Sequence, residues 1–175
     1  MLPRATNSRT VRDARKGKVK GRTQEISRLI GRSLRSIASL DALGELNVVL
    51  DCDVIQADGG TRTTSINGAY VALASALEKH FGSQSTVQQI LKEQVVAISI
   101  GIVDDEVRVD LDYALDSAAQ VDMNIVMTGS GQLIEVQGTG EESTFSHAQL
   151  NQMLECAFKT LPQLCALQRQ ALGWA

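Results

Sequence analysis

A short run of glycine, threonine and arginine has the residue types of an anion-binding site. Residues 58–62 read Asp-Gly-Gly-Thr-Arg and precede a helix expected over 61–81. Paired glycines permit positive φ and a close approach of backbone to ligand. The first N–H groups of a helix point outward at the positive end of its dipole, where they can bind an anion. The hydroxyls of Thr61 and Thr63 and the planar guanidinium of Arg62 suit phosphate oxygens. A plain glycine turn with a threonine cap has the same spacing, and no Walker A Gly-Lys-Ser/Thr follows.

Four carboxylates fall within thirteen positions: Asp110, Asp112, Asp116 and Asp122. Asp110 and Asp112 are expected on one strand face with Arg108, which is typical of a solvated surface. Asp116 and Asp122 flank a turn of small residues, and Asp122 opens an apolar strand. Such a pair could hold Mg²⁺ or give a proton to a leaving oxygen, although acidic pairs in turns also serve as caps.

The charge of the chain is divided unevenly along its length. Residues 1–35 contain 11 Lys/Arg and two acidic residues, a balance of +9, whereas the rest carries −12, for a formal net charge of −3. A basic arm ahead of an acidic body indicates a polyanionic partner bound at one place. A solvated, flexible tail is the alternative interpretation.

Length and composition exclude several classes of protein. The 175 residues suffice for one domain with a buried core, and no apolar run approaches the roughly 20 residues of a membrane span. The opening residues contain no apolar signal core, and the three cysteines are widely spaced and odd in number, so we expect a reduced, cytoplasmic setting. With only two histidines, a histidine-based triad or metal site is not expected.

Hydrophobic periodicity predicts helices and one strand in the first half. A helical stripe begins near Arg22 and runs to Ile37, and a second helix covers 61–81, with a short helix over 86–92. Residues 46–55 alternate between apolar and mostly polar side chains, which predicts a half-buried strand. This strand would lead directly into the glycine turn.

The second half predicts two hairpins and a closing helix. Strands over 95–103 and 107–111 flank Asp104-Asp105, and strands over 123–128 and 133–137 flank a Gly-Ser-Gly turn. The last helix starts near Ser146, a suitable N-cap. This order of helices and hairpins indicates an α+β layered domain.

Taken together, the motifs resemble the bacterial ribonuclease PH family. The resemblance is carried by residues 2–6, 21–26, 50–63, 111–113, 116–127 and 135–139. These segments occur in order and span essentially the whole chain, so the combination is much more specific than any one motif.

The resemblance implies a fold like the second domain of ribosomal protein S5 and a phosphate-dependent 3′→5′ exoribonuclease that trims precursor tRNA as a hexameric ring. It implies a single domain over 1–175, with a basic RNA-contacting loop (1–21) and an α+β body (22–175). The implied phosphate-binding residues are Arg22, Gly60, Thr61 and Arg62; the implied pair for catalysis and Mg²⁺ is Asp116 and Asp122; the implied tRNA-contacting residues are Arg4, Arg9 and Arg12.

One departure from the family concerns the region before Met1. Family members carry an N-terminal segment of several strands there, so we expect a truncated fold with an exposed sheet edge. Two interpretations follow: an active phosphorolytic exoribonuclease, or a catalytically inert RNA-binding or ring subunit of the same family. A small-molecule kinase on the same fold is a third, which the basic arm and the contiguous motifs disfavour.

Overall fold

The computed structural model describes residues 5, 21–141 and 143–174. Except for residues 5 and 21, the predicted RNA-contacting loop lies outside these ranges. In chain order the elements are α1 (Gly21–Ile37), α2 (Leu40–Leu43), α3 (Thr61–Phe81), α4 (Gln84–Ile90), β1 (Val95–Val103), β2 (Glu106–Val109), α5 (Tyr113–Ala118), β3 (Val121–Thr128), β4 (Leu133–Gly140) and α6 (His147–Leu172).

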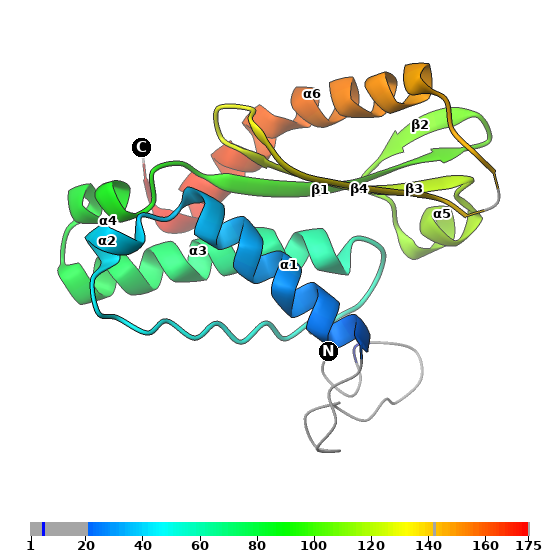
Figure 1. Ribbon diagram of the computed structural model, residues 1–175. Helices are drawn as coiled ribbons and strands as arrows, with labels where there is room; N and C mark the ends of the chain where they lie inside the picture. The colour runs from blue at the N-terminus through cyan, green and yellow to red at the C-terminus, as the bar shows by residue number, and fades with distance from the viewer. Residues whose placement is uncertain (1–4, 6–20, 142, 175) are drawn as a thin grey trace.

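Helices cover both faces of one antiparallel sheet with the strand order β2-β1-β3-β4 (Figure 1). Strand β1 is buried along its whole length, and its side chains alternate between two cores. Val95 and Ala97 pack in the core that includes α1, α3 and α4, whereas Val96 and Ile98 pack in the core that includes α6. A strand buried on both faces reads as a continuous apolar run, which is how 95–103 reads.

The predicted hairpins and long helices are confirmed. Asp104 and Asp105 both have positive φ (52° and 60°), as a two-residue hairpin turn requires. Helix α6 begins with a capping box in which the Ser146 side chain and the Gln149 side chain each satisfy the other's backbone N–H. Among the described residues, no helix is both long and apolar enough to cross a membrane.

The predicted strand over 46–55 is wrong. The segment keeps its alternation, because Leu50, Cys52 and Val54 are half-buried between exposed neighbours, but it lies outside the sheet. In Figure 1 it runs along α3 on the side away from the sheet. Alternation predicts an extended backbone, whereas a strand also needs a hydrogen-bonded neighbour, and no described strand reaches this segment.

The acidic region from 110 to 118 also differs from its prediction. Strand β2 ends at Val109, and Asp110 has a φ of 58°, so Asp110 and Asp112 do not share a strand face with Arg108. The expected small-residue turn is part of helix α5, whose N-cap is Asp112; its carboxylate accepts from the N–H of Leu115 (2.8 Å). Six residues give too little periodicity for a helix to be recognised in the sequence.

Side chains complete the edge of β1 that β2 leaves uncovered. Because β2 pairs only with Ile100–Val103, the first half of β1 has backbone groups without a strand partner on that side. The Asn67 amide of α3 donates to the Ala97 carbonyl (2.8 Å) and accepts from the Ala97 N–H (3.0 Å). Gln168 of α6 donates to the Val95 carbonyl (2.8 Å) and to Asn67 Oδ1 (3.3 Å). Both helices are thereby tied to one strand edge.

We predict that Asn67→Ala lowers the free energy of unfolding by about 2–4 kcal/mol, because it leaves two buried backbone groups of Ala97 without partners. Denaturant titration followed by circular dichroism measures this. Asn151→Ala is the matched control, since Asn151 is exposed on α6 and its side chain lies 3.4 Å from His147 Nδ1 of the same helix. Equal stability of the two variants would contradict this account of the β1 edge.

Candidate phosphate and metal site

The glycine turn precedes α3, whose first backbone N–H groups have no acceptor within the helix. Gly60 is the N-cap of α3 and has a φ of 67°, and no side chain of the described residues caps the helix there. Its carbonyl accepts from the Thr64 N–H (3.0 Å) and from Thr63 Oγ1 (2.8 Å). The threonine cap considered as an alternative is therefore not formed, and the N-terminal amides of α3 remain available to an anion.

Polar side chains lie close to Gly60 on the side of the sheet. A Cβ placed on Gly60 would lie 3.2 Å from Ser99 Oγ, 3.3 Å from Thr63 Oγ1 and 3.9 Å from Asp110 Oδ1. Ser99 is only 2% exposed, and its hydroxyl has no hydrogen-bond partner among the described residues. Sequence reasoning missed Ser99, although a serine inside the apolar run 95–103 was a visible signal.

Arg62 lies at the start of α3, and its side chain forms an ion pair with Glu25 of α1. Its Nη2 is 3.7 Å from Glu25 Oε2, and the Arg62 side chain is 25% exposed. The Nε atom of Arg62 is buried without a partner among the described groups. A buried unpaired donor is costly, so an anion that accepts from it would gain a charge-assisted hydrogen bond. The role of Glu25 was not apparent from the sequence.

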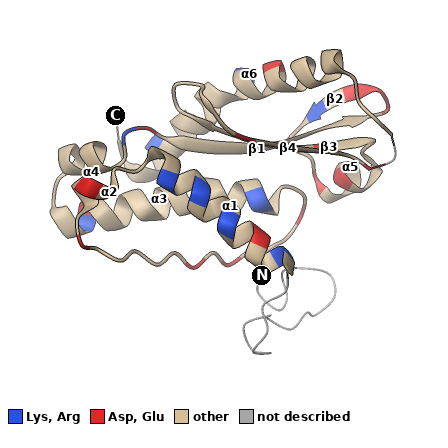
Figure 2. Cartoon of the chain, in the orientation of Figure 1, with Lys and Arg blue, Asp and Glu red and all other residues tan. Residues whose placement is uncertain are grey.

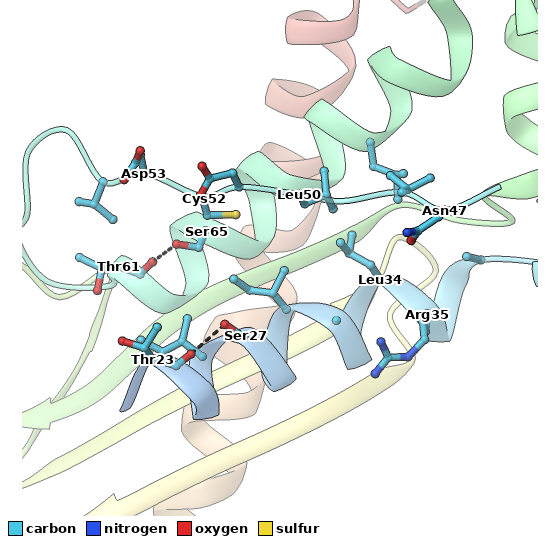
Figure 3. A pocket seen from close by; sticks show the side chains of 18 of the residues that line it. Thr23, Ser27, Leu34, Arg35, Asn47, Leu50, Cys52, Asp53, Thr61 and Ser65 are labelled. Atoms are coloured by element: carbon cyan, nitrogen blue, oxygen red, sulfur yellow. Dashed lines mark hydrogen bonds between the residues drawn. The ribbon is translucent and has the colours of Figure 1, made fainter. Parts of the chain in front are cut away.

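Arg22 lies in the first turn of α1, three residues before Glu25, and is exposed. Together with Thr61 and Asp53 it lines a groove of about 820 Å³ between α1, α3 and the extended segment. Figure 3 shows Asp53 and Thr61 at one end of this groove. The structure thus brings Arg22 to the groove that also contains the start of α3.

Cys52 lines the same groove but does not supply a nucleophile. Burial raises the pKa of its thiol, and the nearby carboxylates of Asp51 and Asp53 raise it further. Because the thiolate is the reactive form, the neutral thiol has little reactivity at neutral pH.

Asp122 lies within electrostatic reach of both Asp116 and Arg62. Asp122 is the second residue of β3, pairs in register with Gly101, and is half-buried. Burial raises the pKa of Asp122, the charge of Asp116 raises it further, and the guanidinium of Arg62 lowers it. Glu141 adds a smaller upward shift to this pKa, and a hydrogen bond from the Met123 N–H opposes it. The structure therefore brings both sequence-predicted carboxylates and Arg62 to one region, around Asp122.

The donor set of this site fits Mg²⁺ better than a transition metal. Two carboxylates provide the hard oxygen ligands that Mg²⁺ takes from proteins, and phosphate and water supply its remaining ligands. Among the described residues there is no group of three or more His, Cys, Asp or Glu that could enclose a metal. Asp116 and Asp122 would hold the ion, whose charge would offset that of the two carboxylates.

The structure does not place the predicted tRNA-contacting residues Arg4, Arg9 and Arg12, which lie outside the described residues. Figure 2 shows basic residues spaced along α1 and acidic residues on α5. Arg28 and Arg35 are exposed on α1, and Arg32 is paired with Glu135 (2.9 Å). The basic character of residues 1–35 therefore continues on the described surface of α1.

Two family models match the chain. The model described as 3′ exoribonuclease family, domain 1, matches residues 1–77, which include α1, α2, the glycine turn and most of α3. The model described as 3′ exoribonuclease family, domain 2, matches residues 93–160, which include the sheet and the acidic pair. The chain belongs to the 3′ exoribonuclease family.

Within that family the chain is similar to ribonuclease PH. It is 58% identical over 174 residues to ribonuclease PH of Bacillus cereus (strain G9842), covering 99% of this chain and 71% of the relative, and 57% identical with the same coverage to that of Bacillus anthracis (strain A0248). The solved structure of rice (Oryza sativa) Rrp46 is similar with a TM-score of 0.65 at 20% identity, covering 90% of this chain and 68% of that one. The predicted family and the α+β fold of the ribosomal protein S5 domain 2 type are confirmed.

We predict that Asp122→Asn raises the melting temperature at neutral pH in metal-free buffer. The folded-state pKa of Asp122 lies above its unfolded value, so the folded state binds more protons between these two values. Ionisation of Asp122 therefore lowers the free energy of unfolding as pH rises through that window. Below about pH 4 the carboxyl group is protonated in both states, so this destabilisation is absent. Asparagine removes the charge, so its advantage should be present at pH 7.5 and vanish near pH 3.5.

Thermal unfolding at several pH values in the presence of a chelator measures the effect. Asp51→Asn is the matched control, because Asp51 is exposed in the extended segment. A lower melting temperature for Asp122→Asn than for the wild type at pH 7.5 would show that burial does not dominate the environment of Asp122.

Proposed function

We propose that this chain carries out phosphate-dependent 3′→5′ exoribonucleolysis on precursor tRNA, with release of nucleoside diphosphates. Membership of the 3′ exoribonuclease family and 58% identity to a ribonuclease PH support this activity. The observation that carries the proposal is local: Arg62 lies at the open start of α3 within electrostatic reach of Asp122, and its Nε has no partner in the described part of the chain.

In this reaction inorganic phosphate is the nucleophile that attacks the last phosphodiester. The amides near Gly60, the Thr61 hydroxyl and the guanidinium groups of Arg62 and Arg22 bind phosphate and orient it in line with the scissile bond. Such positioning, together with charge stabilisation, accounts for most of the catalysis of phosphoryl transfer.

The acidic pair acts on the leaving group of the same reaction. Asp116 and Asp122 would hold Mg²⁺, which would supply offsetting positive charge. One of the two aspartates protonates the leaving 3′-oxygen of the RNA. The bond between phosphorus and that oxygen breaks as the bond to the attacking phosphate forms. The products are a nucleoside diphosphate and an RNA one nucleotide shorter.

Substrate RNA is bound by basic side chains that precede the sheet in the sequence. We assign Arg4, Arg9 and Arg12 to tRNA contacts, and the exposed arginines of α1 provide further positive charge for RNA phosphates. The whole chain, 1–175, acts as one domain, because α1 and α3 pack against the sheet that follows them. A hexameric ring in the cytoplasm is the proposed working form.

The first experiment measures nucleoside diphosphate release from a tRNA with an extended 3′ end, with Mg²⁺, in the presence and absence of inorganic phosphate. We expect release only with phosphate. Intact RNA binding without release would instead identify an inert RNA-binding or ring subunit. Phosphorylation of a small molecule by a nucleoside triphosphate would identify the kinase alternative.

We predict that Arg62→Ala lowers kcat/KM for phosphate by about 10–100-fold, mostly through a higher KM. A hydrogen bond to a charged group contributes about 1.5–3 kcal/mol, and each 1.36 kcal/mol corresponds to a tenfold change. Phosphate titrations at saturating RNA measure the effect.

Arg108→Ala is the control for loss of one positive charge. Arg108 is exposed on β2 and pairs with Glu106 at 2.6 Å, so its removal should leave kcat/KM for phosphate within about threefold of the wild type. The assignment of Arg62 fails if the two variants show the same phosphate dependence.

A further inference from the structure

One carboxylate connects the glycine turn with the helix that carries Asp116. Oδ1 of Asp58 accepts a hydrogen bond from the N–H of Gly59 (3.0 Å) and a second from the N–H of Tyr113 (2.6 Å). Gly59 belongs to the turn that opens α3, and Tyr113 is the first residue of α5, 55 positions after Asp58. Asp58 is exposed and belongs to neither helix.

The same two segments are in direct backbone contact. A Cβ on Gly59 would overlap the carbonyl oxygen of Leu111 and would lie 2.8 Å from the carbonyl carbon of Asp112. Leu111 is fully buried and packs with Val103 and Ala119. The backbone contact sets how closely the two segments approach, and the Asp58 hydrogen bonds keep them from separating.

Helix α5 depends on this link because it has little else to fix its start. It is six residues long and has no buried residue. Its first N–H groups have no acceptor within the helix; Asp112 accepts from Leu115, and Asp58 accepts from Tyr113. A hydrogen bond to a carboxylate is about twice as strong as one between neutral groups.

We propose that Asp58 is a positioning residue, whose carboxylate holds the start of α5 against the glycine turn and so sets Asp116 relative to the phosphate-binding group of Gly60, Thr61 and Arg62. The inference rests on the proposed phosphorolytic function. Asp116 follows Tyr113 by three residues, so a displacement of the helix start displaces its carboxylate. A misplacement of about 1 Å in such a constellation costs on the order of 100-fold in rate.

The variant Tyr113→Pro removes the hydrogen bond to Asp58 and leaves the hydrogen bonds within the helix intact. Tyr113→Pro removes the N–H, and proline suits the first position of a helix, where no intrahelical bond is lost. The preceding Asp112 is extended (φ −73°, ψ 174°), as a residue before proline prefers. Tyr113→Ala is the matched control, because it removes the same side chain and keeps the N–H.

The test measures kcat and KM for phosphate in four single variants and one double variant. Asp58→Ala and Tyr113→Pro should each lower kcat by about 10–100-fold, with KM for phosphate within about threefold of the wild type. Asp58→Asn keeps an acceptor oxygen, so it should retain most of the activity, as should Tyr113→Ala. Asp58→Ala combined with Tyr113→Pro should be no worse than either alone, because both remove one link.

Equal kcat values for Tyr113→Pro and Tyr113→Ala overturn the proposal, and so does an additive double variant. A second readout does not depend on turnover: amide hydrogen exchange of residues 112–118 should accelerate in Asp58→Ala but not in Asp58→Asn. Absence of phosphate-dependent release in the wild type would reject the proposed function, whereas unchanged exchange in Asp58→Ala would reject the link itself.

Discussion

The burial of β1 on both faces is the constraint on which the rest of the molecule depends. A central strand covered by helices on each side needs partners for every backbone group along both edges. Strand β3 supplies one edge, and short β2, Asn67 and Gln168 supply the other. Because Asn67 belongs to α3, its hydrogen bonds to β1 fix the position of α3 on the sheet. The N-terminus of α3, at Gly60, then lies next to Ser99 of β1.

The active-site end of β1 relies on a second close approach. A Cβ on Gly101 would lie 2.6 Å from the carbonyl oxygen of Val121 and 2.7 Å from Cδ1 of Leu111. The absence of a side chain there allows Leu111 to pack onto the sheet, which in turn supports the backbone of Asp112 beneath Gly59. The glycine turn proposed to bind phosphate and the acidic pair are thus brought together by glycines whose neighbours leave no room for a methyl group.

Local patterns in the sequence predicted the long helices and the two hairpins, but not the contacts between distant segments. Helical stripes and the hairpin around Asp104-Asp105 depend on near neighbours and were read correctly. The alternation of 46–55 predicted the extended backbone but not the lack of a strand partner, because pairing is a property of two segments. The roles of Asp58, Glu25 and Ser99 arise from contacts across the chain, and no spacing in the sequence encodes such contacts.

The capped edge of β1 also limits how this sheet can be extended by another chain. Exposed strand edges can template further strands, and proteins block them with side chains, charges or short strands. Asn67 and Gln168 already occupy the uncovered half of β1, and β2 is four residues long and carries the charged pair Glu106–Arg108. Strand β4, eight residues long and mostly exposed, is the longer terminal strand of the described sheet. Any subunit that joined this sheet by strand addition would therefore do so along β4, on the side of the sheet opposite β2.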